Sequence, residues 1–224
     1  MTGVQTCALP IYHGHTGLSV QVGDPRFSKL FLSEGPPEDI VQVPFNDLAA
    51  MEAAVSVGDA ACVIMETIPA TYGFPMPAEG YLKAIKALCE KHGSLYIADE
   101  VQTGLMRCGA MWGIETYDVI PDILVTGKGL SGGIYPIAAV VASARAAVWL
   151  KEDGFGHMSS FGGAELGCIA AAKVLEICLR PETKTIVGHI ARHMRDGLQS
   201  IMASQCDFFI GIRQIGRASC RERV

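Results

Sequence analysis

Apolar strand-like segments alternate with helical segments along most of this 224-residue chain, and this alternation limits the folds open to it. The strand-like segments are 39–45, 61–68, 94–101, 122–127 and 137–143. The helical patterns cover 47–58, 78–93, 165–179 and a stretch near 184–202. Strands that are apolar throughout and separated by helices are typical of a parallel sheet covered on both faces. We therefore predict an α/β fold with a mostly parallel sheet and helices on both faces.

Local signals support the limits of two of these helices. Asp47 stands where a side chain can accept a hydrogen bond from the first turn of the helix that follows. Gly93 stands where the second helix should stop. The apolar stripe of that second helix consists of Tyr81, Leu82, Ile85, Leu88 and Cys89.

Composition excludes several classes of partner. Half of the residues are hydrophobic and 18% are charged, as in globular proteins, and we expect one domain. There is no run of about 18 apolar residues, so we expect no transmembrane helix. The net charge is −5 and the sequence has no cluster of lysine and arginine, which argues against nucleic acid or an anionic membrane as partner.

The two ends have a different character from the rest. "MTGVQTCALPI" (1–11) and "IGRASCRERV" (215–224) resemble translations of common sequencing adapters. We therefore expect residues 1–11 and 215–224 to be non-native, extended and poorly packed, and we leave them out of the fold prediction. Residues 12–214 are then expected to be an internal part of a longer gene product.

The cysteines between these ends show no C-x-x-C pair. We predict buried, reduced thiols and no metal site, which favours a reducing, cytoplasmic location. The cysteines concerned are Cys62, Cys89, Cys108, Cys168, Cys178 and Cys206.

The segment "DILVTGKGLSGG" (122–133) sets Lys128 among glycines directly after a strand. Such a position suits phosphate cradling, dinucleotide binding or a covalent bond between the lysine and a cofactor, and it also suits an ordinary solvated lysine. Two other strands end in acids, Glu66 and the pair Asp99-Glu100. Each acid alone could form a salt bridge or face solvent. Because parallel α/β sheets bind ligands at the carboxyl ends of their strands, we expect Glu66, Asp99 and Lys128 to face one crevice.

Nucleotide binding explains this pattern poorly. "LYIADE" resembles the acidic strand of a nucleoside triphosphatase, but Gly129 stands where the phosphate loop needs serine or threonine. Residues 127–132 spell G-x-G-x-x-G, yet they lead into a strand-like run where the dinucleotide fingerprint needs a helix. Pyridoxal phosphate chemistry needs a lysine that forms a Schiff base and a carboxylate that keeps the pyridine nitrogen protonated. Lys128 and Asp99 supply both groups.

Five stretches carry a resemblance to a known family. They are "YHGHTGLS", "ETIPATYGF", "YIADEVQTGLMRCGAMWG", "DILVTGKGLSGGIYPIAAV" and "SSFGGAELGC". Together they resemble the class III aminotransferases, which are fold-type I pyridoxal phosphate enzymes, over nearly all of residues 12 to 213. The resemblance implies that residues 12–214 form an incomplete version of the large, cofactor-binding domain of such an enzyme.

The resemblance also implies roles for individual residues. Lys128 is the Schiff-base lysine, Asp99 the partner of the pyridine nitrogen, and Gln102 the partner of the phenolic oxygen of the cofactor. Val101 and Tyr12 pack on the cofactor ring, and His13 and Glu66 are also expected at the cofactor site. Ser160 is expected to reach the phosphate in the neighbouring subunit, which implies a homodimer with shared active sites.

Departures from the family leave the reaction open. The expected glycine-serine turn that holds the phosphate would precede Tyr12, and the small C-terminal domain would follow the chain. Thr71 stands where many relatives have a second acid, and Ala164-Glu165 replaces a common Asn-Pro pair. The resemblance implies transfer of an amino group between an amine or amino acid and an oxo acid. A racemase, aminomutase, decarboxylase or phospho-lyase of the same family, or an inactive gene fragment, remains as the alternative.

Overall fold

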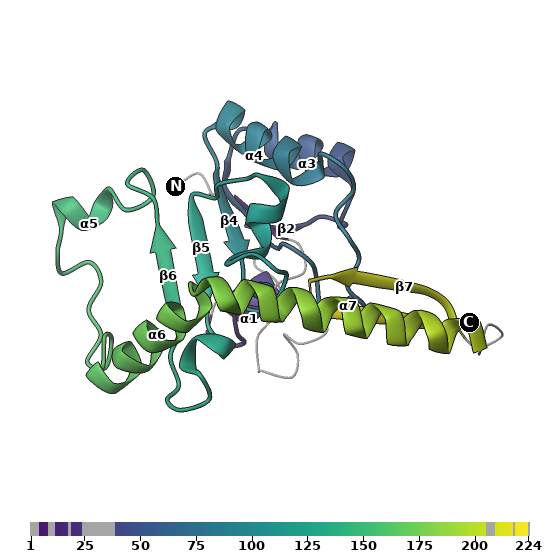
Figure 1. The fold of residues 1–224 in the computed structure, drawn as a ribbon. Coiled ribbons are helices and arrows are strands. Elements are labelled where there is room, and N and C mark those ends of the chain that lie inside the picture. The colour runs from purple at the N-terminus through teal and green to yellow at the C-terminus, as the bar shows by residue number, and fades with distance from the viewer. Residues whose placement is uncertain are drawn as a thin grey trace.

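A six-stranded sheet forms the centre of the computed structural model, which describes residues 5–8, 12–17, 19–23, 39–204, 209–216 and 218–223 (Figure 1). The strand order is β2-β1-β3-β4-β5-β6. The strands are β1 (Gln5–Ala8), β2 (Ile40–Gln42), β3 (Ala60–Glu66), β4 (Leu95–Asp99), β5 (Ile123–Thr126) and β6 (Ala139–Ala142). All neighbours pair parallel except β5 and β6, which pair antiparallel. The predicted mostly parallel sheet is confirmed.

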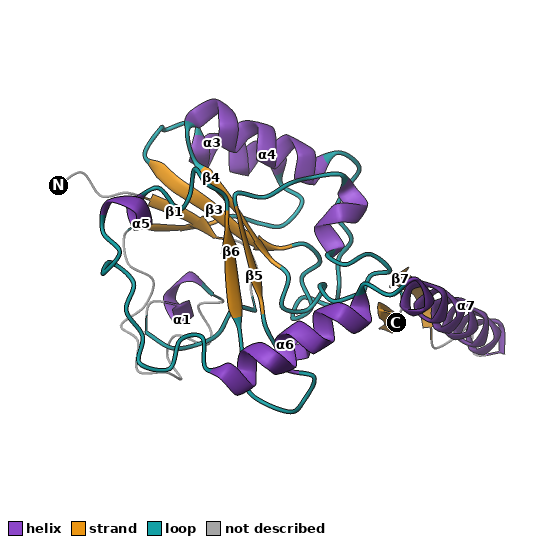
Figure 2. Ribbon diagram, turned by 60° about the vertical axis from the view of Figure 1, so that its left-hand side comes forward, coloured by secondary structure: helices purple, strands orange, loops and turns teal. Residues whose placement is uncertain are grey.

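Helices lie on both sides of this sheet, as predicted. They are α1 (Ser19–Val22), α3 (Leu48–Val55), α4 (Tyr81–His92), α5 (Trp149–Glu152), α6 (Glu165–Cys178) and α7 (Pro181–Ser204), with the 3₁₀ helices η2 (Gly113–Tyr117) and η3 (Lys128–Ser131). Figures 1 and 2 show α3 and α4 on one face of the sheet and α6 on the other. The long helix α7 extends away from the sheet beside the hairpin of β7 (Phe209–Ile215) and β8 (Ala218–Arg223).

The main core lies between the sheet and the α3–α4 layer. Met51 and Val55 of α3, Ile85 of α4, and Val63 and Tyr96 of the sheet are all inaccessible to solvent. The predicted stripe of α4 is buried in full. Asp47 accepts a hydrogen bond from the backbone N–H of Ala50 at 2.9 Å, and Gly93 ends α4 with φ of 78°. Both predicted helix limits are therefore confirmed.

The opposite face carries a smaller core. Leu105, Leu130 and Ala171 form its buried part, and Ile137 and Val174 pack against them. This cluster fixes η3, which begins at Lys128, against α6. It therefore links the loop that carries the lysine to the helix layer below the sheet.

Residues 5–8 are extended, as expected, but the prediction of poor packing is wrong for them. Strand β1 pairs parallel with both β2 and β3, and the side chain of Cys7 is fully buried in the main core. The reason is physical: β1 satisfies its backbone hydrogen bonds on both sides, and Cys7 directs a small apolar side chain against the core. Residues 218–223 are extended, as expected, and pair with β7. The non-native origin of residues 1–11 and 215–224 stays a prediction.

The cysteines follow the prediction only in part. Cys89 and Cys108 are buried, and burial raises the pKa of each thiol to about 12. Cys62 and Cys178 are only half-buried, and Cys168 lies exposed, because α6 turns Gly167 and Ala171 inward and Cys168 outward. Cys206 lies outside the described residues.

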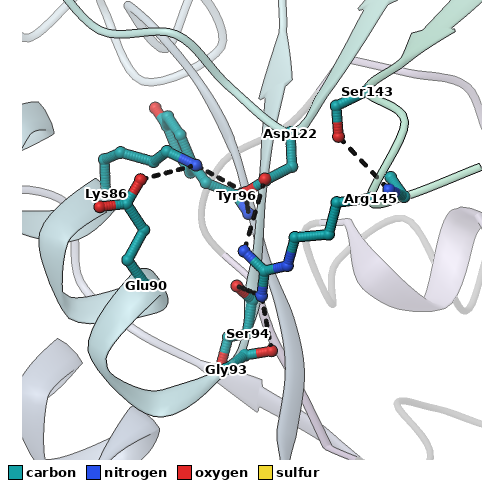
Figure 3. A network of polar contacts seen from close by, with 9 residues as sticks. Lys86, Glu90, Gly93, Ser94, Tyr96, Asp122, Ser143 and Arg145 are labelled. Carbon is teal, nitrogen blue, oxygen red and sulfur yellow. Dashed lines mark hydrogen bonds and ion pairs between the residues drawn. The ribbon is translucent and has the colours of Figure 1, made fainter.

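A polar network joins the amino ends of β4 and β5 to α4 and to the segment after β6 (Figure 3). Asp122 accepts hydrogen bonds from Lys86 Nζ at 2.8 Å and from the backbone N–H of Tyr96 at 2.9 Å. Arg145 lies 3.6 Å from Asp122 and donates to the backbone oxygens of Gly93 and Ser94. This network therefore fixes the end of the sheet opposite to the edge where Glu66, Asp99 and Lys128 lie.

No helix in the described part of the chain is both long enough and apolar enough to cross a membrane.

Candidate functional site at the carboxyl edge of the sheet

The strands β3, β4 and β5 end side by side, and this edge carries the predicted site residues. Glu66, the last residue of β3, lies in register with Asp99, the last residue of β4. Asp99 in turn lies in register with Val125 of β5, and Lys128 follows three residues later. Parallel pairing thus brings two acids and a lysine from distant parts of the sequence to one edge.

Asp99 is a fully buried carboxylate with two backbone donors. Oδ2 accepts a hydrogen bond from the backbone N–H of Tyr12, and Oδ1 accepts one from the backbone N–H of Val101 at 3.1 Å. Burial raises the pKa of Asp99, while these two donors and the neighbouring His13 act to lower it. The contact with Tyr12 joins residues 87 positions apart.

Lys128 has an unusual backbone conformation for a lysine. Its φ of 50° lies in the left-handed region, which residues other than glycine rarely adopt. Its ammonium group donates to Gln102 Oε1 at 2.6 Å and lies 4.9 Å from the centre of the Tyr12 ring. A cation at this distance from an aromatic face is attracted by the ring. Tyr12 therefore contacts both Asp99, through its backbone, and Lys128, through its ring.

Two further predicted residues lie beside Asp99. His13 is half-buried, and burial lowers its pKa, although the charge of Asp99 acts in the opposite direction. Glu66 is fully buried, and burial raises its pKa to about 8. The structure thus collects Tyr12, His13, Glu66, Asp99 and Lys128 at one edge.

A cavity of about 360 Å³ adjoins Lys128. Val101 and Gln102 also line it, whereas Asp99 and Tyr12 do not. This volume lies within the usual range for small-molecule sites. Residues that the sequence prediction missed complete the wall, among them Ile68, Phe74, Arg107, Met194 and Arg213. Ile68, Phe74 and Arg107 lie within the stretches "ETIPATYGF" and "YIADEVQTGLMRCGAMWG" but were given no role there. Met194 of α7 and Arg213 of β7 lie outside every quoted stretch.

Ser160 is the predicted residue that the structure does not bring to this edge. It lies exposed in the segment between α5 and α6 and does not line the cavity. The predicted role of Ser160 concerns a neighbouring subunit, so within one chain it stays a prediction.

Glu100 follows β4 as predicted, but it neither forms a salt bridge within the described part of the chain nor faces solvent, the two roles considered for a single acid there. It is buried and accepts four hydrogen bonds, from Thr67 and Thr103 and from the backbone N–H groups of Gly113 and Ile114. Burial raises its pKa although all four donors oppose this shift. Glu100 therefore fixes the start of η2 and the residue after β3 to the end of β4, and so supports the loop that carries Val101 and Gln102.

The α/β sheet thus brings a lysine and a buried aspartate to one tyrosine beside a cavity of ligand size, which is the arrangement of α/β proteins with a small-molecule site at the carboxyl edge. Residues 8–222 match the family described as aminotransferase class-III. The chain therefore belongs to the class-III aminotransferases.

Known proteins agree with this assignment. The chain is 46% identical to an uncharacterized aminotransferase of Archaeoglobus fulgidus, over 92% of this chain and 47% of that protein. It is 41% identical to the acetylornithine aminotransferase of Shewanella oneidensis, over 85% of this chain and 46% of that protein. The solved ornithine aminotransferase of Toxoplasma gondii, which holds pyridoxal phosphate in partial occupancy at its active site, is 28% identical and superimposes with a TM-score of 0.88. All of this chain aligns with 52% of that structure. The chain thus spans about half the length of these relatives.

Proposed function

We propose that this chain is part of a pyridoxal phosphate-dependent aminotransferase, which moves an amino group between an amine or amino acid and an oxo acid. The main observation behind the proposal is that Asp99 and Lys128 both contact Tyr12 at the carboxyl edge of the sheet. Asp99 accepts a hydrogen bond from its backbone N–H, and Lys128 lies over its ring. The groups present fit the cofactor chemically: a primary amine, a buried carboxylate and an aromatic ring are the partners of its aldehyde, its ring nitrogen and its ring face.

Each residue has a distinct task in this proposal. The cofactor supplies an aldehyde that bonds to amines and a ring that withdraws electrons from the bonded carbon. Lys128 would hold the cofactor through Nζ, and once a substrate amine displaces it, the free Nζ would accept or return a proton. Asp99 would hold the ring nitrogen in its protonated form, because an adjacent negative charge favours the charged form of a base.

The remaining residues position and enclose the ring. Gln102 already accepts a hydrogen bond from Lys128, and its amide would bind the phenolic oxygen of the cofactor. Tyr12 and Val101 would pack on the ring, and His13 would lie beside Asp99. The side chains of Val101 and Gln102, which line the cavity next to Lys128, support this arrangement.

We further propose that the active protein is a homodimer in which Ser160 reaches the phosphate of the partner's cofactor. The support is an apolar flank of exposed side chains in α6 and in the segments that connect η3 to β6 and α5 to α6, the last of which contains Ser160. Figure 1 shows β6, α5 and α6 on one side of the molecule. This apolar flank consists of Ile134, Phe155, Met158, Phe161, Leu166 and Ile169, each at least 66% exposed. Exposed apolar groups of this kind are typical of interfaces.

A reducing, cytoplasmic location is also part of the proposal. Its support is the buried thiols of Cys89 and Cys108, whose pKa values burial raises and which therefore stay protonated.

Covalent trapping of the cofactor tests the proposal. The chain is mixed with pyridoxal phosphate and reduced with borohydride, and the modified peptide is identified by mass spectrometry. We expect a single major adduct, on Lys128, which Lys128→Ala abolishes. Lys83→Ala, which removes an exposed lysine paired with Asp118, is the matched control and should leave the adduct in place. Adducts spread over surface lysines and unaffected by Lys128→Ala would contradict the proposal.

A further inference from the structure

Glu66 is a buried acid at the candidate site for which the proposed chemistry has no use. It ends β3 in register with Asp99, and its side chain is inaccessible to solvent. Oε2 accepts a hydrogen bond from the backbone N–H of Ala70 at 3.1 Å. Oε1 is also buried, and it has no hydrogen-bond partner among the described residues. An unpartnered buried oxygen on an ionised carboxyl group is costly, so this environment favours the neutral acid.

The charged groups around Glu66 come from two elements. Asp99 on β4 acts to raise the pKa of Glu66, and Lys128 on η3 acts to lower it, as does the hydrogen bond from Ala70. Burial is the largest effect and raises the pKa to about 8. Two neighbouring carboxyl groups in a site of low polarity do not both ionise readily, and one of them keeps a proton.

Hydrogen bonding decides which of the two acids keeps it. Burial raises the pKa of Asp99 too, but Asp99 accepts from two backbone N–H groups and lies beside His13, which oppose this shift. Glu66 has one backbone donor, and its second oxygen has none. The ionised form is therefore better stabilised at Asp99 than at Glu66.

We propose that Glu66 is a positioning residue that carries a proton at neutral pH, so that Asp99 holds the single negative charge of the pair. The role of that charge rests on the proposed function, since only an ionised Asp99 can keep a pyridine nitrogen protonated. The protonation of the pair itself is a property of this chain and can be measured without any cofactor.

Infrared difference spectroscopy of the cofactor-free chain tests the inference. The carbonyl stretch of a protonated carboxyl group should be present near pH 6 and should disappear as the pH rises through about 8. Glu66→Gln should remove this titrating band. Asp99→Asn should lower its midpoint by about half a pH unit or more, because it removes the charge that helps Glu66 to hold its proton. Glu90→Gln, which changes an acid at the amino end of the sheet, is the control and should leave the midpoint unchanged.

Two results would overturn the inference: a Glu66 that is already ionised near pH 6, or a midpoint that Asp99→Asn leaves unchanged. The titration of the unmodified chain and of Asp99→Asn decides the matter even where Glu66→Gln does not fold. Failure of the proposed function would give a different result: the Lys128 adduct would not form, while Glu66 would still titrate near pH 8.

Discussion

Glu66, Asp99 and Glu100 are three buried acids at two neighbouring strand ends, and they differ in how many donors they meet. Glu100 accepts four hydrogen bonds and acts as a structural link. Asp99 accepts two from the backbone and stands beside the lysine site. Glu66 accepts one. Burial raises the pKa of all three, but the donors determine which charge the site can keep.

The proton on Glu66 predicts a pH-dependent stability. Its pKa rises from the ordinary value of 4.5 to about 8 in the folded chain, so the folded state binds this proton more tightly than the unfolded state. The resulting stability is complete below pH 4.5 and is lost as the pH rises through about 8, by on the order of 3–5 kcal/mol. Glu66→Gln should therefore flatten the fall in unfolding free energy between about pH 5 and 8, as measured by urea denaturation. An unchanged slope would contradict the prediction.

The charge on Asp99 predicts a loss of turnover in the full-length enzyme. Asp99→Asn keeps the shape of the side chain and the reaction of Lys128 with the cofactor, but a neutral amide cannot keep the ring nitrogen protonated. We expect turnover to fall by at least about tenfold, or 1.4 kcal/mol of barrier, while a borohydride-trapped adduct still forms on Lys128. Steady-state kinetics checks this. A fall of less than about threefold would show that Asp99 has another role.

For single residues, the sequence predicted which side chains lie together at the site but not which hydrogen bonds fix them. Lys128, Asp99 and Gln102 follow from motifs at strand ends. The hydrogen bond from Tyr12 to Asp99 spans 87 positions, and the donors to Glu100 at Gly113 and Ile114 lie in a short 3₁₀ helix without a periodic pattern. Contacts of this kind depend on the folded arrangement and leave no local signal.

At the scale of elements, strands and helices with strong periodicity were predicted close to their observed limits. The segment 78–93 contains α4 (Tyr81–His92), and 165–179 contains α6 (Glu165–Cys178). The antiparallel direction of β6 and the place of β1 inside the sheet were not predictable in this way. Strand direction and order follow from how connections cross the sheet, whereas an apolar run has the same pattern in either direction.

The network at the amino ends of the strands predicts a stability difference between two ion pairs. Burial raises the pKa of Asp122, but the hydrogen bonds from Lys86 and Tyr96 and the nearby cations outweigh this, so the pKa is lowered. The side chains of Lys86 and Asp122 are only 18% and 7% exposed. Asp122→Asn would leave the largely buried Lys86 with Glu90, which lies 3.3 Å away and is 60% exposed, as its anionic partner. Because this exposed acid replaces the lost charge only in part, we expect a loss of about 1–3 kcal/mol at neutral pH by urea denaturation.

The matched control is Asp118→Asn. Asp118 is 90% exposed and pairs with an exposed Lys83, so its loss should destabilise the fold clearly less than the loss of Asp122. The difference between the variants should shrink as the pH falls below the ordinary Asp value of 3.8, because Asp122 then takes up its proton. Equal losses in the two variants at neutral pH would mean that the network of Asp122 does not stabilise the fold.

For the whole molecule, the two faces of the sheet are unequally covered. The α3–α4 layer buries a continuous core, whereas the α6 side has a small one and leaves the apolar flank exposed. The sequence predicted a helix over 165–179 but could not show that apolar side chains on it, such as Leu166 and Ile169, stay exposed in the described chain. An apolar residue has the same sequence signal whether its own chain or a second chain covers it.

The apolar flank predicts that the 224-residue chain self-associates and is prone to aggregate. Phe161 and Leu166 are 88% and 68% exposed, and placing charge there should oppose contact between chains. We expect Phe161→Glu combined with Leu166→Lys to shift the mass measured by size-exclusion chromatography with light scattering toward that of a single chain. Val57→Lys is the control, because Val57 is 69% exposed but lies in the turn between α3 and β3, outside the flank. A wild-type chain that stays monomeric as its concentration rises would refute the proposed interface, and with it the role of Ser160 at a shared site.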